Sequence, residues 1–162
     1  MRRLEDRPLP SELMTIIRKD QQWLDLCSAA APIFSTCSKA EVYSVIVNNK
    51  TQRIIGTGFN GVPSGWQHCR DGGCPRGTSD VPSGSTYDSG PGLCFAAHAE
   101  VNALTHGDPT QFHESTLYVN KAPCVGCQRA ILGTAITRVV CPRIPWMNLF
   151  DSDDRIEVEF VY

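Results

Sequence analysis

The sequence predicts an α/β protein whose second half contains a largely parallel sheet. Two observations favour this class: strand and helix patterns alternate in the second half, and a long helix and a β-hairpin precede them. The chain has 162 residues, of which 41% are hydrophobic and 20% are charged, as in one soluble globular domain. We therefore expect a single domain over 1–162, with residues 1–10 as an N-terminal extension.

The first half predicts one helix and one hairpin. Apolar residues recur at helical spacing from Ser11 to about Phe34, and Ser11 can cap this helix. Residues 41–47 are rich in β-branched side chains, and residues 51–58 return as a second strand after a turn. These strands should pair antiparallel.

Residues 61–93 form an insert of a different kind. Gly and Pro make up 12 of its 33 residues. Between residues 70 and 92, proline aside, the side chains with apolar character are those of Cys74, Val81 and Tyr87. Such a segment cannot form its own core, so we expect it to be held by something other than burial or to be mobile.

The second half predicts short helices between strands. We expect helices at 97–104 and 124–132, strands at 116–119, 136–140 and 156–161, and a further short helix at 145–150. Residues 142–155 must then hold the last crossover, which is just long enough for a parallel connection.

Composition excludes several functions. Lys and Arg number 15 and Asp and Glu 17, so the net charge is −2 and the chain lacks an overall basic footprint for nucleic acid. No apolar run approaches the roughly 20 residues that span a bilayer, and no secretory signal is visible. We expect a cytoplasmic protein that binds neither membrane nor nucleic acid.

The clearest chemical motif joins His98-Ala99-Glu100 to the segment 123–127, Pro-Cys-Val-Gly-Cys. H-x-E followed by P-C-x-x-C is the signature of zinc-dependent nucleobase deaminases. Each half lies at a predicted helix start, so His98, Cys124 and Cys127 can bind one zinc ion and leave a fourth position for water. Glu100 lies nearby without being needed as a ligand, so it can transfer protons as the catalytic residue.

Other interpretations exist for the separate parts of this motif. A lone histidine at a helix start is usually a cap or a surface residue, and a lone C-x-x-C pair can be a redox site. A redox protein would leave His98 and Glu100 unexplained. An inactive, zinc-stabilised interaction module is a further alternative, but a structural zinc site has no use for the proton shuttle that Glu100 offers.

Further segments resemble the cytidine deaminase superfamily and, within it, the dCMP deaminases. They are 58–65 (Gly-Phe-Asn-Gly-Val-Pro-Ser-Gly), 98–104 (His-Ala-Glu-Val-Asn-Ala-Leu) and Cys37. The resemblance covers about Trp23 to Cys141 and implies a three-layer fold, a mixed five-stranded sheet flanked by helices. It also implies a single deaminase domain that converts dCMP to dUMP, a homo-oligomer, and dCTP and dTTP as effectors.

The resemblance suggests contacts to a nucleotide. Asn60 resembles the family asparagine that contacts the sugar, although an Asn-Gly pair is also common in plain turns. A 5′-phosphate needs a cation, and Lys121 lies near the expected mouth of the site. Lys39 and Arg70 are further candidates, and each of the three could instead be a solvated surface residue.

The substrate itself stays open at this point. Tyr43 and Ser44 stand where family members usually carry Gly and Ala, on a strand expected under the pocket. Another small nucleoside, base or antibiotic-pathway compound is therefore an alternative substrate. Transfer RNA or single-stranded DNA is less favoured, because no basic stripe with interleaved aromatic residues is visible.

The remaining cysteines suggest a second, structural zinc ion, which some relatives of this family hold beside the active site. The candidate ligands are Cys37, Cys69, Cys74 and Cys94, with His68 as an alternative. Such a site would tether both ends of the insert. Alternatively, these cysteines are free buried thiols. Cys27 and Cys141 lie in apolar patterns and should belong to the core.

Overall fold

The structure, a computed structural model, describes residues 10–82, 85–145 and 147–161, so most of the expected N-terminal extension lies outside the described residues. A sheet with the order β2-β1-β3-β4-β5 forms its centre. The strands are β1 (Tyr43–Asn48), β2 (Ile54–Phe59), β3 (Ser115–Val119), β4 (Arg138–Pro142) and β5 (Glu157–Val161). β1 runs antiparallel to β2 and β3, whereas β3, β4 and β5 are parallel. This mixed five-stranded sheet confirms the predicted fold class.

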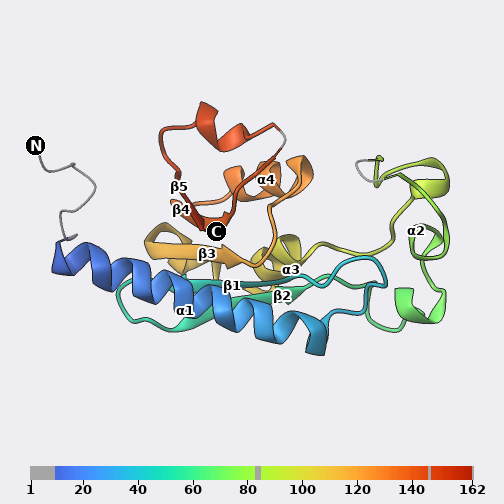
Figure 1. Cartoon of the computed structure of the whole chain (residues 1–162), viewed down its shortest axis with the longest axis horizontal. Coiled ribbons are helices and arrows are strands. Elements are labelled where there is room, and N and C mark those ends of the chain that lie inside the picture. Colours follow the sequence, from blue (N-terminus) through green and yellow to red (C-terminus); the bar gives the residue numbers. More distant parts are fainter. Residues whose placement is uncertain (1–9, 83–84, 146, 162) are drawn as a thin grey trace, which may run out of the picture.

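Helices cover both faces of the sheet and make three layers (Figure 1). α1 (Ser11–Phe34) lies on one face, while α3 (Ala99–His106) and α4 (Val125–Leu132) lie on the other. α1 has the predicted bounds, but Ser11 does not cap it: Pro10 occupies the capping position, and no side chain caps the helix. No helix in the described part of the chain has the length and apolar character needed to cross a bilayer.

The last crossover differs in detail from the prediction. A 3₁₀ helix at Leu149–Ser152 replaces the short helix expected at 145–150, of which Trp146 lies outside the described residues. This turn packs against α4 and buries Phe150. The crossover is therefore long enough to bring β5 back parallel to β4.

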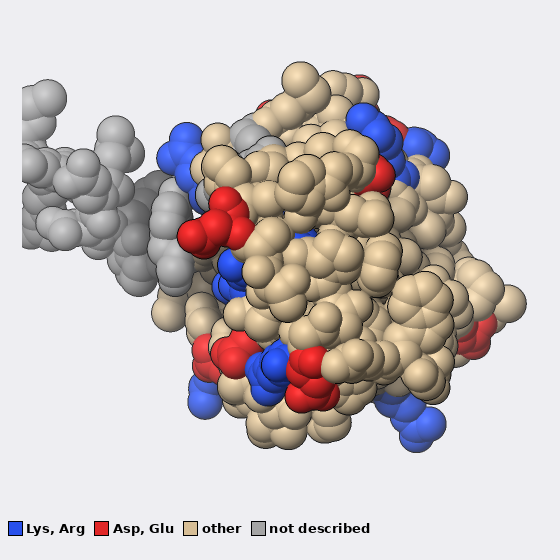
Figure 2. All heavy atoms as spheres, turned by 90° about the vertical axis from the view of Figure 1, so that its right-hand side faces the viewer, with Lys and Arg blue, Asp and Glu red and all other residues tan. Residues whose placement is uncertain are grey.

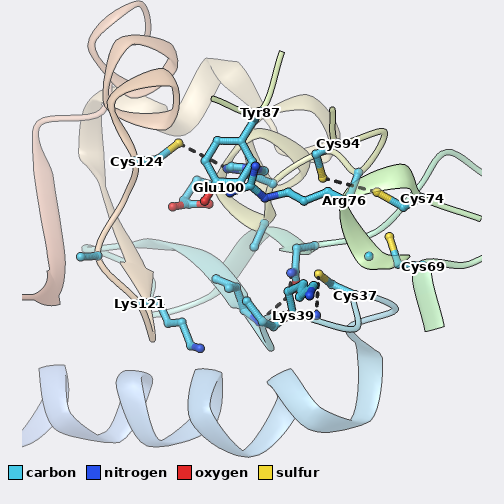
Figure 3. A pocket seen from close by; sticks show the side chains of 18 of the residues that line it. Cys37, Lys39, Cys69, Cys74, Arg76, Tyr87, Cys94, Glu100, Lys121 and Cys124 are labelled. Carbon is cyan, nitrogen blue, oxygen red and sulfur yellow. Dashed lines mark hydrogen bonds between the residues drawn. The ribbon is translucent and has the colours of Figure 1, made fainter. Parts of the chain in front are cut away.

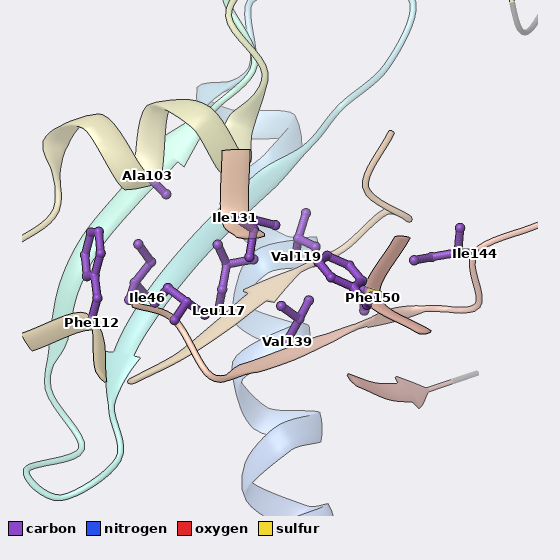
Figure 4. Packing of buried hydrophobic residues seen from close by; sticks show 11 residues of the cluster. Ile46, Ala103, Phe112, Leu117, Val119, Ile131, Val139, Ile144 and Phe150 are labelled. Carbon is purple, nitrogen blue, oxygen red and sulfur yellow. The ribbon is translucent and has the colours of Figure 1, made fainter. Parts of the chain in front are cut away.

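Buried side chains divide between the two faces because successive residues of a strand point to opposite sides. Figure 4 shows the cluster on the α3 and α4 face, which includes Ile46, Leu117, Ile131 and Val139. The cluster on the α1 face contains Leu24, Cys27, Val45, Val47, Tyr118 and Val140. As predicted, Cys27 and Cys141 are fully buried.

A buried ion pair fastens α1 to the sheet. Arg138 donates two hydrogen bonds to the Asp20 carboxylate, at 2.9 and 2.7 Å, and the Tyr118 hydroxyl donates a third at 2.8 Å. Asp20 is only 3% exposed. Because a buried carboxylate is costly unless it is paired and hydrogen-bonded, these bonds fix how α1 lies on β3 and β4.

α3 lies very close to β2 because Gly58 has no side chain. A Cβ at Gly58 would lie 2.2 Å from the Ala99 carbonyl oxygen and 2.3 Å from the Ala103 nitrogen. Such distances are far inside van der Waals contact, so only glycine fits. This contact therefore sets the depth of α3, and with it the positions of His98 and Glu100 at the start of that helix.

The insert lies at one end of the molecule, at the right of Figure 1, and contains α2 (Pro75–Thr78). Hydrogen bonds to backbone carbonyls hold much of it. Arg76 Nη1 donates to the carbonyl oxygens of Thr86 (3.0 Å) and Gly92 (2.9 Å), and Ser79 Oγ donates to that of Pro91 (2.9 Å). This agrees with the expectation that the insert needs something other than burial to hold it.

Candidate active site

A cavity of about 630 Å³ opens beside the carboxyl ends of β3 and β4. Its walls come from the segment before β1, the insert, the start of α3 and the loop between β3 and α4. Figure 3 shows side chains from these segments pointing into one space. Crevices at the carboxyl ends of parallel strands are the usual ligand sites of α/β sheets.

His98, Cys124 and Cys127 converge in this region, as the motif predicts. His98 Nδ1 lies 3.4 Å from Cys124 Sγ and 3.3 Å from Cys127 Sγ, and all three ligand atoms lie within 4.8 Å of one another. His98 precedes α3, while Cys124 precedes α4 and Cys127 lies in its first turn. One imidazole and two thiolates suit zinc, and three protein ligands leave a position open, as in catalytic zinc sites. The residues therefore fit a catalytic zinc ion.

Hydrogen bonds among the three ligands shift their pKa values. Hydrogen bonds from the Cys127 thiol and from His98 lower the pKa of Cys124 to about 4. The hydrogen bond to Cys124, together with burial, raises the pKa of Cys127. The hydrogen bond to Cys124 also raises the pKa of His98. A divalent cation would bind favourably to a thiolate that lies beside a thiol and an imidazole. Its charge would also stabilise the ionised form of the second cysteine.

Glu100 lies in the first turn of α3, lines the cavity and is 4% exposed. Its carboxyl interacts with the Cys127 thiol. Burial raises the pKa of Glu100. A buried carboxyl with a raised pKa is a feature of general acid–base residues in other enzymes.

Two cavity residues from the insert were not predicted as site residues. The Tyr87 ring packs edge-on against the His98 ring, with centroids 4.9 Å apart and planes at 85°. The Arg76 guanidinium lies over the Tyr87 ring, 4.1 Å from its centroid (Figure 3). Tyr87 carried a signal, because it is one of the few apolar side chains in the insert. Arg76 carried none, because a single arginine in a polar segment is ordinarily a surface residue.

Asn60 lines the cavity, but the protein itself engages its amide. Asn60 Oδ1 accepts hydrogen bonds from Ser35 Oγ (2.6 Å) and from the Val42 nitrogen (3.0 Å). Asn60 Nδ2 donates to the Ala40 carbonyl oxygen (2.7 Å). This side chain therefore fastens the segment before β1 to the end of β2, a role that the sequence did not suggest.

The three candidate cations lie in different places. Lys121 and Lys39 both line the cavity, and Lys39 Nζ donates to the Ser79 carbonyl oxygen at 3.0 Å. Arg70 does not line it: it faces a neighbouring hollow and pairs with Glu41 at 3.1 Å. Lys39 and Lys121, unlike Arg70, therefore line the same cavity as His98 and Glu100.

Tyr43 and Ser44 begin β1, directly after Val42, which lines the cavity, but neither of the two is among the described residues that line it. Tyr43 packs against Phe34 of α1, with ring centroids 5.6 Å apart. Ser44 is fully buried and donates from Oγ to the Tyr118 carbonyl oxygen at 2.9 Å. Both side chains therefore make contacts within the protein.

The four further cysteines, Cys37, Cys69, Cys74 and Cys94, all line the same cavity, whereas His68 is exposed and does not. The sulfur atoms of Cys74 and Cys94 lie 3.9 Å apart. Burial and a hydrogen bond with Cys74 raise the pKa of Cys69 to about 12. Within residues 10–82, 85–145 and 147–161, however, these cysteines do not bring three ligand atoms within 4.8 Å of one another.

Comparisons with known proteins agree with this site. Residues 17–142 match the family described as the cytidine and deoxycytidylate deaminase zinc-binding region. A deoxycytidylate deaminase of Mycobacterium phage D29 is 42% identical over 125 residues, which are 76% of this chain and 94% of that protein. A deoxycytidylate deaminase of Schizosaccharomyces pombe is 36% identical over 122 residues, which are 75% of this chain but only 36% of that protein.

Solved structures share the fold. The dCMP deaminase of the cyanophage S-TIM5 superposes with a TM-score of 0.60 and 20% identity, covering 94% of this chain and all of that one. At this level of identity the likeness concerns the fold alone. The family match spans both halves of the zinc motif and the sheet that positions them. The chain therefore belongs to the cytidine and deoxycytidylate deaminase zinc-binding family.

Proposed function

We propose that the protein is a zinc-dependent deaminase that hydrolyses dCMP to dUMP and ammonia. The observation that carries the proposal is the buried Glu100 carboxyl, which lines one cavity with His98 and Cys124, the residues that converge with Cys127 as zinc ligands. The function of the phage D29 relative, a deoxycytidylate deaminase matched over 94% of its length, supports dCMP as the substrate.

Glu100 would carry the protons of this reaction. When bound, zinc supplies a Lewis acid and lowers the pKa of a water ligand. Glu100 accepts a proton from the water whose oxygen adds to C4 of cytosine, and gives that proton to the ring nitrogen. It then moves the remaining hydroxyl proton to the amino group, which leaves as ammonia. One water is consumed and one ammonia released, and the carboxylate is regenerated.

Asn60 and Lys121 are proposed to contact the nucleotide. Asn60 Nδ2 carries two hydrogens, and its bond to Ala40 uses one of them. The other is available to a sugar hydroxyl in the cavity that Asn60 lines. Lys121 is exposed, lines the same cavity and offers a positive charge near a phosphate.

A second, structural zinc ion is proposed at Cys37, Cys69, Cys74 and Cys94. All four line one cavity, and the 3.9 Å between the sulfur atoms of Cys74 and Cys94 is close to the roughly 3.8 Å between two sulfurs of a tetrahedral zinc site. Binding would require the cysteines to move closer together, because no three of their sulfur atoms lie within 4.8 Å of one another in the described residues. The ion would tie the segment before β1 to both ends of the insert.

Self-association is proposed as well. Several apolar side chains of α1 are exposed: Leu13, Met14, Ile16, Ile17, Leu26, Ile33 and Phe34. A second copy that packed against this helix would remove them from water. Sedimentation velocity should therefore show a species larger than the 17.8 kDa chain, and a monomer at micromolar concentration would contradict this. The effectors dCTP and dTTP remain predictions.

Ammonia release from a panel of substrates tests the function. The panel is dCMP, deoxycytidine, cytidine, guanine and a single-stranded oligonucleotide, each with zinc-loaded protein. We expect the highest kcat/KM for dCMP. Figure 2 is consistent with a small substrate, because basic and acidic side chains are interspersed on a largely uncharged face at the insert end. A higher kcat/KM for another member of the panel would overturn the assignment of dCMP.

A further inference from the structure

We propose that Arg76 binds the 5′-phosphate of the substrate and thereby selects a nucleoside monophosphate over the corresponding nucleoside. The inference rests on the proposed function and assigns the phosphate to a residue that the sequence motif does not contain. It follows from the burial of Arg76, from its unused hydrogen-bond donors, and from its place in the cavity.

Arg76 is a buried cation without a carboxylate partner among the described residues. It is 8% exposed, and none of the ion pairs formed by those residues includes it. Of the described residues that line the cavity, Glu100 is the one acidic side chain. A buried charge is costly unless it is paired and hydrogen-bonded. An anionic group of the substrate would supply the missing charge.

One edge of the Arg76 guanidinium has unused hydrogen-bond donors. Arginine carries five N–H donors. Nη1 uses its two on the carbonyl oxygens of Thr86 and Gly92, at 3.0 and 2.9 Å. Within the described residues, Nε and Nη2 form no hydrogen bond with the protein. Together they make the planar fork that binds phosphate or carboxylate through two parallel hydrogen bonds.

This edge of the guanidinium retains accessible surface. Of the side-chain nitrogen and oxygen atoms in the described residues, Thr36 Oγ1 alone is both fully buried and without a partner. Nε and Nη2 of Arg76 are therefore not sealed in the interior, and the residue lines the cavity that also contains His98 and Glu100. A nucleotide with its base at Glu100 would place its phosphate in this same space.

Two contacts hold the guanidinium in place before a ligand arrives. The carbonyl groups fix Nη1, and the plane lies over Tyr87, which itself packs edge-on against His98. Fixing a charged group in advance lowers the entropy cost of binding. Lys121, by contrast, is exposed, and Lys39 Nζ already donates to the Ser79 carbonyl oxygen. Arg76 is thus the preorganised cation of the cavity.

The test compares dCMP with deoxycytidine, which differ only in the phosphate. In Arg76→Gln we expect kcat/KM for dCMP to fall about 10–100-fold, the loss of a charge-assisted pair, while kcat/KM for deoxycytidine changes less than about threefold. Calorimetry should show a loss of the same size in binding affinity for dUMP and little change in affinity for deoxyuridine. Arg70→Gln is the matched control, because Arg70 pairs with Glu41 outside this cavity, and it should behave as wild type.

The alternative is that Arg76 only fastens the insert. The proposal would be overturned if kcat/KM of Arg76→Gln fell equally for dCMP and deoxycytidine while the affinity for dUMP relative to deoxyuridine stayed unchanged. If Arg76→Gln does not fold, Arg76→Lys is measured instead, because lysine keeps the charge but lacks the planar fork. A fall in kcat/KM of about tenfold for dCMP alone supports the proposal. An equal fall for dCMP and deoxycytidine refutes it. Wild-type protein that releases no ammonia from dCMP would instead overturn the proposed function, and this inference with it.

Discussion

Two of the zinc-binding residues, His98 and Cys124, line the same cavity as the insert, but the zinc-binding residues and the insert are held in different ways. The zinc-binding residues lie at the starts of α3 and α4, whose inner side chains, such as Ala103 and Ile131, are fully buried. The fully buried Gln128 adds polar contacts there, since its amide donates to the Pro123 carbonyl oxygen and accepts from the Leu149 nitrogen, at 3.0 and 2.7 Å.

The insert, in contrast, contributes little to the hydrophobic core. Neither of the two clusters of buried apolar residues contains a residue of 61–93. Hydrogen bonds to carbonyl groups and the pair of Arg76 and Tyr87 hold it over the cavity. The comparison teaches that the zinc-binding residues are positioned by helices packed in the core, whereas the insert is held mainly by polar contacts.

The largest effect should follow from removing a zinc ligand. Cys124→Ser removes one of three protein ligands, so we expect loss of the catalytic zinc and of measurable turnover. Zinc content by elemental analysis checks this. Cys141→Ser, a buried cysteine outside the cavity, is the control and should retain zinc in the folded protein. Unchanged zinc in Cys124→Ser would refute the ligand assignment.

Glu100→Gln should separate zinc binding from catalysis. The amide has nearly the same shape but cannot shuttle protons, so we expect turnover to fall by about 10²–10⁴-fold or more while zinc content stays the same. Steady-state kinetics and elemental analysis measure both. Glu114→Gln changes a partly exposed side chain that pairs with Lys50, and it should leave turnover unchanged. Near wild-type turnover in Glu100→Gln would exclude the proposed proton transfers.

Gly58→Ala tests whether the close packing of α3 against β2 positions that helix. The new methyl group would overlap the Ala99 carbonyl oxygen and the Ala103 nitrogen, so α3 must move. We expect the free energy of unfolding to fall by about 1–3 kcal/mol, the usual cost of overpacking, with some loss of turnover. Gly133→Ala is the control, because its nearest neighbours lie at 3.4 Å, and chemical denaturation should show a small change. Equal stability of the two variants would contradict the close approach of α3.

The smallest effect on the stability of the core should come from Cys69→Ser. If the second zinc ion exists, its loss should lower the zinc content from two ions per chain to one and make the insert sensitive to limited proteolysis. Global unfolding should change less than in Gly58→Ala, and the catalytic zinc should remain. One zinc per chain in fully active wild-type protein, with Cys69 readily alkylated, would mean that these cysteines only pack.

Local patterns in the sequence were sufficient for the fold class, the bounds of α1 and the zinc motif. The alternation of apolar residues reports which side of a helix or strand is buried, and the spacing in H-x-E and P-C-x-x-C is fixed within one helix turn each. These features depend on neighbours along the chain, so no other part of the molecule is needed to recognise them.

Only the tertiary structure decided what surrounds that motif. Asp20 pairs with Arg138, Gly58 admits α3, and Arg76 and Tyr87 enter the cavity from a segment with almost no periodic pattern. Tyr43 packs against Phe34 of α1, a contact that a strand pattern does not predict, because it gives two alternating faces but not which layer covers each. Contacts between distant residues depend on how the layers pack, and a single sequence carries no local signal for them.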